Sequence, residues 1–176
     1  LNLIEKEKKI LKTTVPITVK ISPDIEDENI NIISDVLLKH NVEALIVSNT
    51  TDKNRENLSN INKLEKGGLS GKPLEKISNE LINKFYKFLK NKVKIIGVGG
   101  VDSGKSAYQK IISGASLIQL YTGMIYQGPS IASKISEELI NILDKEGVKN
   151  ISDVVGSKNW SWLVTLEHLY NHKFYV

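Results

Sequence analysis

The chain has 176 residues, a length that suits one domain or part of a larger protein, and its 40 % apolar and 25 % charged residues are typical of a globular fold. The net charge of +4 is scattered in short mixed runs without a basic stripe carrying aromatic residues, so nucleic acid is not an expected partner. The absence of cysteine excludes disulfides, thiolate metal sites and a cysteine nucleophile.

The first residues, 1–14, carry no signal-peptide pattern, and no apolar run in the chain reaches the ~20 residues needed to cross a bilayer. The sequence opens on Leu1 rather than on methionine. We therefore expect residues 1–14 to be a lead-in segment from a longer chain.

Four apolar runs rich in β-branched residues predict strands, and helical patterns separate them. The runs are nearly continuous, as in strands that are buried on both faces. They cover residues 15–22, 43–50, 93–100 and 115–122. Helical patterns cover residues 27–40, 74–90, 104–113 and 129–146. The resulting βαβαβαβα order predicts parallel strands with right-handed crossovers, either in an open doubly wound sheet or in part of a (β/α)₈ barrel.

Two stretches interrupt this pattern. Residues 51–72 form a long polar loop directly after a predicted strand. Both architectures keep their chemistry at the C-terminal ends of the strands, and so long a loop in a compact domain is more often functional than accidental. Residues 158–176 form an atypical tail that contains both tryptophans. We interpret the tail as a packing segment or as sequence unrelated to the domain, with an amphipathic surface for a partner or a membrane as the alternative.

The three histidines receive no functional role. His40 ends a predicted helix, where a capping hydrogen bond is common. His168 and His172 are four residues apart in the tail, but no metalloprotease-type motif surrounds them. No metal site is predicted.

The segment GVGGVDSGKS at 97–106 fits the phosphate-binding pattern G-x-x-x-x-G-K-[ST] from Gly99 onward. A nucleoside triphosphatase also needs a second apolar strand that ends in aspartate to hold magnesium. The other predicted strands end in VSNT, QLYT and VKISPD, and the last places Asp24 in a loop beyond a proline. A P-loop triphosphatase therefore remains an alternative, although none of the other predicted strands ends in the aspartate that it needs.

A mononucleotide phosphate site explains the same residues. Gly99 and Gly100 lack side chains, so a phosphate could approach their backbone N–H groups. Tyr121 and Thr122 end the next predicted strand beside another turn. The last two strands of a barrel commonly build such a site. In this interpretation the helix at 104–113 adds a favourable dipole, and its Lys105 and Ser106 are incidental.

Several blocks of the sequence resemble the C-terminal half of class 2 dihydroorotate dehydrogenase, the quinone-linked flavoenzyme of pyrimidine synthesis. The similarity covers about residues 15–157, in the family's order. Its blocks are VKISPD, IVSNTT, GGLSGKPL, the long segment IIGVGGVDSGKSAYQKIISGASLIQLYTGMIYQGP and ELINILDKEGVKNISDVVG. The resemblance implies a TIM barrel with FMN across its mouth, of which this chain supplies the C-terminal four βα units.

The resemblance also assigns roles to residues near the cofactor ring. Lys20 matches the lysine that contacts the flavin, where a cation would stabilise the anionic reduced form. Ser48 matches a hydroxyl that contacts the flavin. Asn49 and Thr50 match residues that hold dihydroorotate, whose carbonyl and N–H groups an amide and a hydroxyl can pair.

The remaining matches are contacts with the rest of FMN. They are Ser70 and Gly71 in the loop before a helix, Gly99 and Gly100 in the phosphate cradle, and Tyr121 with Thr122, which complete it. In this interpretation the phosphate held by the GVGG segment is the tail of FMN.

The implied activity is oxidation of dihydroorotate to orotate, with FMN as hydride acceptor and ubiquinone or another quinone as electron acceptor. The family's catalytic serine lies in the N-terminal half of the barrel, to which nothing here aligns. We therefore expect the isolated chain to be an inactive fragment. Its parent would be membrane-associated, at the mitochondrial inner membrane in a eukaryote or the cytoplasmic membrane in a bacterium. The alternatives are a class 1 enzyme that uses fumarate or NAD, the triphosphatase, and a non-catalytic interaction fragment.

Overall fold

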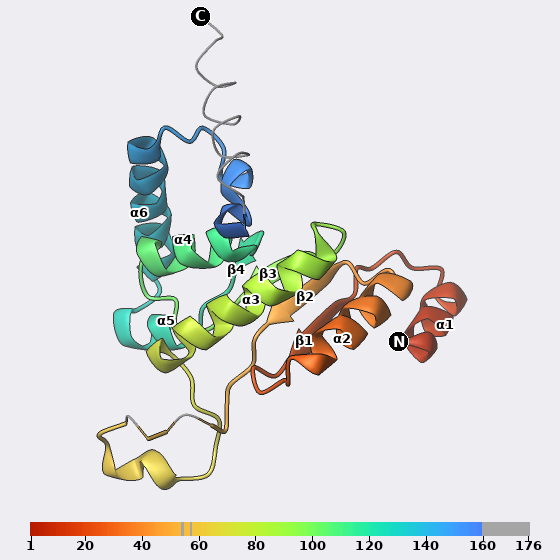
Figure 1. Ribbon diagram of the computed structural model, residues 1–176, viewed down its shortest axis with the longest axis horizontal. Coiled ribbons are helices and arrows are strands. Elements are labelled where there is room, and N and C mark those ends of the chain that lie inside the picture. Colours follow the sequence, from red (N-terminus) through yellow and green to blue (C-terminus); the bar gives the residue numbers. More distant parts are fainter. Residues whose placement is uncertain (54, 57, 160–176) are drawn as a thin grey trace, which may run out of the picture.

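The structure, a computed structural model, describes residues 1–53, 55–56 and 58–159 (Figure 1). Its strands are β1 (Thr18–Ile21), β2 (Ala44–Val47), β3 (Lys94–Gly97) and β4 (Leu117–Ile118). Its α-helices are α1 (Asn2–Ile10), α2 (Glu28–Lys39), α3 (Glu75–Leu89), α4 (Gly104–Ser113), α5 (Thr122–Gln127) and α6 (Ile131–Glu146). Short 3₁₀ turns are η1 (Ile61–Leu64), η2 (Lys72–Leu74), η3 (Ile151–Val154) and η4 (Ser157–Asn159).

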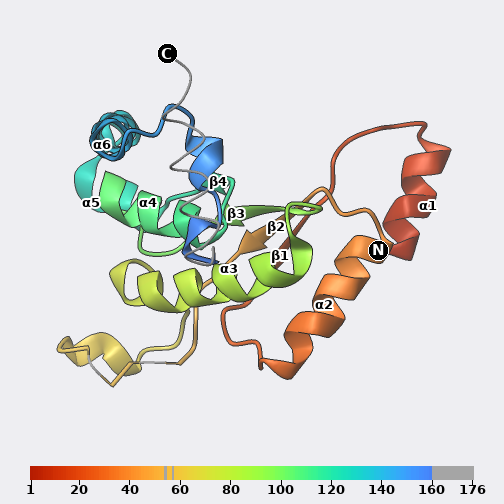
Figure 2. The same cartoon turned by 45° about the horizontal axis from the view of Figure 1, so that its top comes forward.

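The sheet is parallel throughout, and its strands follow one another in sequence order, β1-β2-β3-β4. A doubly wound sheet instead reverses its strand order at a switch point, so that helices cover both faces. Right-handed crossovers between consecutive neighbouring strands put every connecting helix on the same face. Helices α2 and α3 accordingly lie side by side along the sheet, and α3 contacts α4 (Figure 2). This topology is that of four consecutive units of a barrel.

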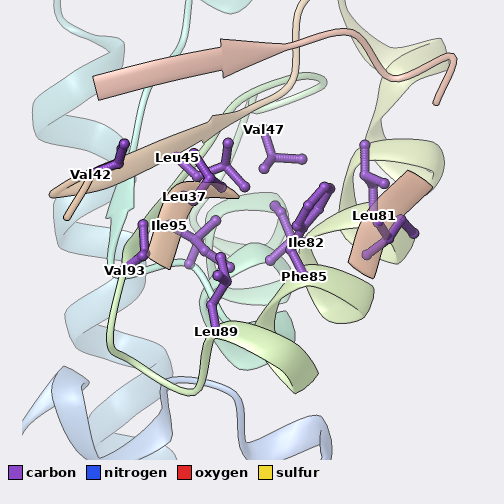
Figure 3. Close-up of a cluster of buried hydrophobic side chains, with 12 residues drawn as sticks. Leu37, Val42, Leu45, Val47, Leu81, Ile82, Phe85, Leu89, Val93 and Ile95 are labelled. Atoms are coloured by element: carbon purple, nitrogen blue, oxygen red, sulfur yellow. The ribbon is translucent and has the colours of Figure 1, made fainter. Parts of the chain in front are cut away.

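The main core lies between the sheet and helices α2 and α3 (Figure 3). Leu45 and Val47 of β2 and Ile95 of β3 are at most 2 % exposed, and Ile82 and Phe85 of α3 are fully buried in the same cluster. Burying one such side chain stabilises the fold by roughly 1.5–3 kcal/mol. The predicted amphipathic helices and apolar strands therefore meet as their sequence patterns indicated.

Among the residues that the structure describes, no helix that connects two strands covers the other face of the sheet. The register aligns Lys20, Ile46, Ile96 and Leu117 in one row across the four strands. Because side chains alternate along a strand, this row points away from the core cluster that contains Val19 and Leu45. Leu117 is 60 % exposed. Three apolar side chains in this row, Ile46, Ile96 and Leu117, are what the inside of a barrel provides.

The prediction of a strand over residues 115–122 is wrong in the length of the strand. Only Leu117–Ile118 pairs with β3, because β3 ends at Gly97 and offers no further ladder partner. Gln119 makes one more hydrogen bond, to Gly97 O at 2.9 Å, and α5 then begins at Thr122. The sequence pattern did not predict this short helix.

The two ends of the chain bear on the predicted domain boundaries. Helix α1 lies within the predicted lead-in segment, has no buried residue, and contacts the domain through a hydrogen bond between Glu5 and His40 at 3.0 Å and an ion pair between Lys8 and Glu43 at 3.6 Å. The boundary at residue 15 stays a prediction. Of the predicted tail at 158–176, residues 160–176 lie outside the described residues, as do His168 and His172. Among the helices of the described residues, none combines the length and apolarity required to span a bilayer.

Candidate active site

A pocket of about 380 Å³ lies at the C-terminal ends of the strands. It is lined by Lys20 of β1 and by residues beyond the ends of β2, β3 and β4. All ten residues that the sequence nominated are among them: Lys20, Ser48, Asn49, Thr50, Ser70, Gly71, Gly99, Gly100, Tyr121 and Thr122. The fold therefore brings together residues from five separate segments of the chain, while the role of each stays a prediction.

The glycine pair after β3 forms a wall of this pocket that only glycine can build. Gly99 and Gly100 have φ of +108° and +72°, which side-chain-bearing residues rarely adopt. A Cβ on Gly100 would lie 2.5 Å from Glu75 Cβ and 2.8 Å from Glu75 Cα. Within the described residues, no acceptor bonds to the N–H of Gly99 or Gly100. A bare backbone with available N–H groups fits an anion such as a phosphate.

The opposite wall joins the loop at 51–72 to the start of α5. The Thr122 hydroxyl donates a hydrogen bond to Ser70 Oγ at 3.0 Å. Gly71 packs so closely that a Cβ there would lie 2.9 Å from Thr122 Cγ2. Barrel phosphate sites often include a short extra helix beside the last strands. Helix α5 occupies that place, and Tyr121 immediately precedes it.

Asn49 and Thr50 are held in place by residues that the sequence analysis did not select. Asn49 N donates to Ile21 O at 2.8 Å. The fully buried Thr51 donates through its hydroxyl to Asp24 Oδ1 at 2.5 Å, and Asp52 N donates to Asp24 Oδ2 at 3.1 Å. Asp24 therefore ties the segment after β2 to the loop after β1. Its position in the block VKISPD was the available signal.

Lys72 and Asp102 are two further pocket residues that were missed. The Lys72 ammonium lies 2.6 Å from Glu75 Oε2 and 3.2 Å from Asp102 Oδ2. The hydrogen bond to Glu75 is the main cause of a raised pKa for Lys72. Burial alone would raise the pKa of Asp102, but hydrogen bonds from Lys72 and Ser103 leave it lowered. With two carboxylates already beside it, Lys72 adds little net positive charge to the pocket.

The GKS end of the phosphate-loop motif does not line the pocket. Lys105 is exposed on α4, whereas the lysine of a triphosphatase loop reaches the nucleotide phosphates. Ser106 forms a capping box with Ser103. Gly104 N donates to Glu138 Oε2 of α6 at 2.5 Å. The expectation that the dipole of this helix would assist an anion is therefore wrong, because a carboxylate of the chain already occupies the helix end.

Replacing Ser106 with alanine should destabilise the chain by about 1 kcal/mol, because a capping side chain contributes about that much. Ser106 Oγ accepts hydrogen bonds from Asp102 N and Ser103 N, both at 3.0 Å. The matched control is Lys105→Ala, which should change the unfolding free energy by less than about 0.5 kcal/mol. Urea denaturation measures both. Equal losses for the two variants would contradict the structural role of Ser106.

Comparison with known proteins places the chain in a family. A family model described as dihydroorotate dehydrogenase matches residues 2–143. The chain is 44 % identical over 154 residues to a Trichodesmium erythraeum protein named dihydroorotate dehydrogenase (quinone), covering 82 % of this chain and 40 % of that protein. The chain belongs to the dihydroorotate dehydrogenase family.

Other relatives of the dihydroorotate dehydrogenase family agree with this assignment. An Arabidopsis thaliana protein named dihydroorotate dehydrogenase (quinone), mitochondrial, is 42 % identical, covering 81 % of this chain and 31 % of its own length. The crystal structure of a DHODH from Eimeria tenella in complex with ferulenol superposes with a TM-score of 0.80 at 41 % identity, covering 83 % of this chain and 39 % of that one. The predicted family, its quinone-linked class and the barrel are confirmed, and the chain spans less than half the length of these relatives.

Proposed function

We propose that this chain forms the part of a quinone-dependent dihydroorotate dehydrogenase that holds FMN and dihydroorotate. The observation that carries the proposal is the single pocket that gathers all ten matched residues at the C-terminal ends of the strands. In the proposed reaction, dihydroorotate loses two hydrogens and becomes orotate, one hydrogen leaving as a proton to a base. FMN, when bound, supplies the acceptor for the other as a hydride, and a quinone takes up the two electrons in turn.

The phosphate end of FMN would lie between the glycine wall of the pocket and the wall opposite it. Gly99 and Gly100 offer backbone N–H groups on a surface without side chains. Tyr121 and Thr122 approach from the start of α5, where the first N–H groups of a helix lack intrahelical acceptors. Ser70 and Gly71 would close the site, since Ser70 already bonds to Thr122. Neutral donors of this kind can hold a phosphate while Lys72 remains paired with its carboxylates.

The ring end of FMN and the substrate would lie nearer β1 and β2. Lys20 places a cation at the end of β1, where it would stabilise negative charge on the reduced ring. Ser48 is 2 % exposed and contributes a hydroxyl beside it. The exposed Asn49 and Thr50 would orient dihydroorotate through its carbonyl and N–H groups. The anchoring of this segment to Asp24 would keep that orientation constant between turnovers.

The proton-accepting base and the quinone site are proposed to lie in the portion of the relatives that this chain does not match. No catalytic residue is assigned within the chain, and we propose that residues 1–176 alone do not turn over dihydroorotate. Association with a membrane, mitochondrial inner or bacterial cytoplasmic, would likewise come through that portion.

Titration with FMN tests the proposal directly. The experiment uses the chain itself and a hybrid enzyme, in which residues 15–159 replace the matching part of the Trichodesmium erythraeum relative. Binding should quench flavin fluorescence. Riboflavin, which lacks the phosphate, should bind at least about tenfold more weakly, since a charge-assisted hydrogen bond contributes about 1.5–3 kcal/mol.

Two further measurements separate the alternatives. Magnesium ATP should not compete with FMN, and the hybrid enzyme should reduce a quinone analogue when dihydroorotate is present. Competition by ATP would favour the triphosphatase. A hybrid enzyme that folds but retains no FMN would refute the proposed function.

A further inference from the structure

Lys110 of α4 is fully buried, yet no carboxylate in the described part of the chain pairs with it. Its ammonium donates to Ser78 Oγ and to Asn79 Oδ1 of α3, each at 3.0 Å. Both partners are neutral. A buried ammonium without a counter-ion destabilises the fold, so its retention behind the pocket requires an explanation.

Ser78 connects this ammonium to the backbone at the floor of the pocket. The Ser78 hydroxyl donates to Val98 O at 2.5 Å, and Val47 O lies 3.3 Å from the same oxygen. Val98 N donates to Val47 O at 2.6 Å, so this one hydroxyl contacts the ends of both β2 and β3. A Cβ added to Gly99 would lie 3.4 Å from Ser78 Cβ.

The protonation of Lys110 decides which way the Ser78 hydroxyl points. An ammonium can only donate, so Ser78 must accept from it and directs its own proton to a carbonyl at the strand ends, of which Val98 O is the nearer. A neutral amine can instead accept the Ser78 proton, which would leave the half-buried Val98 carbonyl with one donor fewer. This loss would affect the backbone positions of Ser48 and Gly99, which lie just beyond the two strand ends.

We propose that Lys110 is a positioning residue of the proposed FMN site: its ammonium fixes the Ser78 contact to Val98, and its charge behind the end of β3, where its Cδ would lie 3.1 Å from a Cβ on Gly97, couples anion binding to proton uptake. This inference depends on the proposed function. Lys110 touches neither cofactor nor substrate and acts through Ser78 and through its charge.

The charged groups around Lys110 are compatible with titration of its ammonium near neutral pH. Burial lowers the pKa of Lys110 to about 7, with Glu75 opposing and Lys72 assisting this effect. The acids of α6 that reach α4 bond elsewhere, Glu138 to Gly104 N and Glu146 to the Tyr108 hydroxyl. From η4, which also contacts α4, Lys158 is exposed to solvent. A phosphate bound in front of Lys110 favours its charged form, so FMN affinity should fall as the pH rises from 7 to 9.

The experiment measures FMN dissociation constants of the hybrid enzyme at pH 7 and pH 9. Between pH 7 and pH 9 the FMN dissociation constant of the unsubstituted hybrid should increase about fivefold more than that of its Lys110→Met variant. This factor is expected if the bound phosphate raises the pKa of Lys110 by about one unit. Lys105→Met, on the same helix but exposed, should behave like the parent. Riboflavin should show no such difference between parent and Lys110→Met.

Calorimetry in buffers of different ionisation enthalpy gives a second readout that a structural role alone would not change. FMN binding to the parent should take up about half a proton at pH 7.5, and Ser78→Ala should retain this uptake because it keeps the ammonium. Should Lys110→Met fail to fold, the uptake by the parent and by Ser78→Ala still decides the question. No uptake, or equal pH profiles in all variants, would overturn the inference, whereas absence of FMN binding at every pH would refute the proposed function instead.

Discussion

Replacing Gly100 with alanine should lower the unfolding free energy of the chain by about 2–4 kcal/mol, because two costs combine. The first is the positive φ of +72°, which costs alanine about 1 kcal/mol. The second is a clash with the start of α3, since the new Cβ would lie 2.8 Å from Glu75 Cα. Overpacking against backbone typically costs about 1–3 kcal/mol. Urea denaturation followed by circular dichroism measures the change.

The matched control for this prediction is Gly147→Ala at the end of α6. Gly147 has a similar φ of +68°, but an added Cβ would meet no atom within 4 Å. This variant should therefore lose only about 1 kcal/mol, from backbone conformation alone. Equal losses for the two variants would show that Gly100 is not tightly packed against α3. FMN affinity should fall in Gly100→Ala and stay unchanged in Gly147→Ala, which lies outside the pocket.

Replacing Lys20 with methionine in the hybrid enzyme should reduce the rate of flavin reduction by dihydroorotate about a hundredfold. Removing one preorganised group that faces developing charge typically costs that much or more. Loss of this positive charge disfavours the reduced ring. The midpoint potential of bound FMN should therefore fall by about 30–60 mV, which corresponds to about 1.4–2.8 kcal/mol for two electrons. Stopped-flow absorbance and a redox titration measure the two quantities.

Lys94→Met is the control for Lys20, because Lys94 is an exposed strand lysine at the opposite end of the sheet and does not line the pocket. Its flavin potential and reduction rate should match those of the parent. An unchanged potential in Lys20→Met would contradict contact between this cation and the flavin ring. A lowered FMN affinity alone, with normal rate and potential, would assign Lys20 to binding rather than to stabilising charge.

The order and type of the main elements could be predicted from the sequence, because each depends on a local pattern. Ile30 and Leu37 recur at helical spacing in α2 and are both buried. The apolar run around Leu45 predicted a strand that is buried as expected. The ten matched residues could also be nominated, because each lies in a block that resembles the family, at the end of a strand, just beyond it, or before a helix.

The predictions that failed concern relations between elements. The length of β4 depends on where β3 ends, and the start of α5 depends in turn on where that short strand stops. The helix at 104–113 would attract an anion if it stood alone, but Glu138 of α6 already occupies its first N–H. Asp24 was considered only as a magnesium ligand, and its hydrogen bond from Thr51, which links the loop after β1 to the segment after β2, was not predicted.

By itself, the sequence determined the βα order, the amphipathic faces and the glycine pair at the third strand end, since periodicity and the absence of side chains are local properties. Only the tertiary structure decided that these strand ends share one pocket, that a carboxylate bonds to the first N–H of α4, and that Lys110 is buried behind the end of β3. The physical reason is that burial, pairing and charge depend on neighbours brought close by parallel strands. Lys105 and Lys110 are both lysines of one helix, and only packing against α3 distinguishes the exposed one from the buried one.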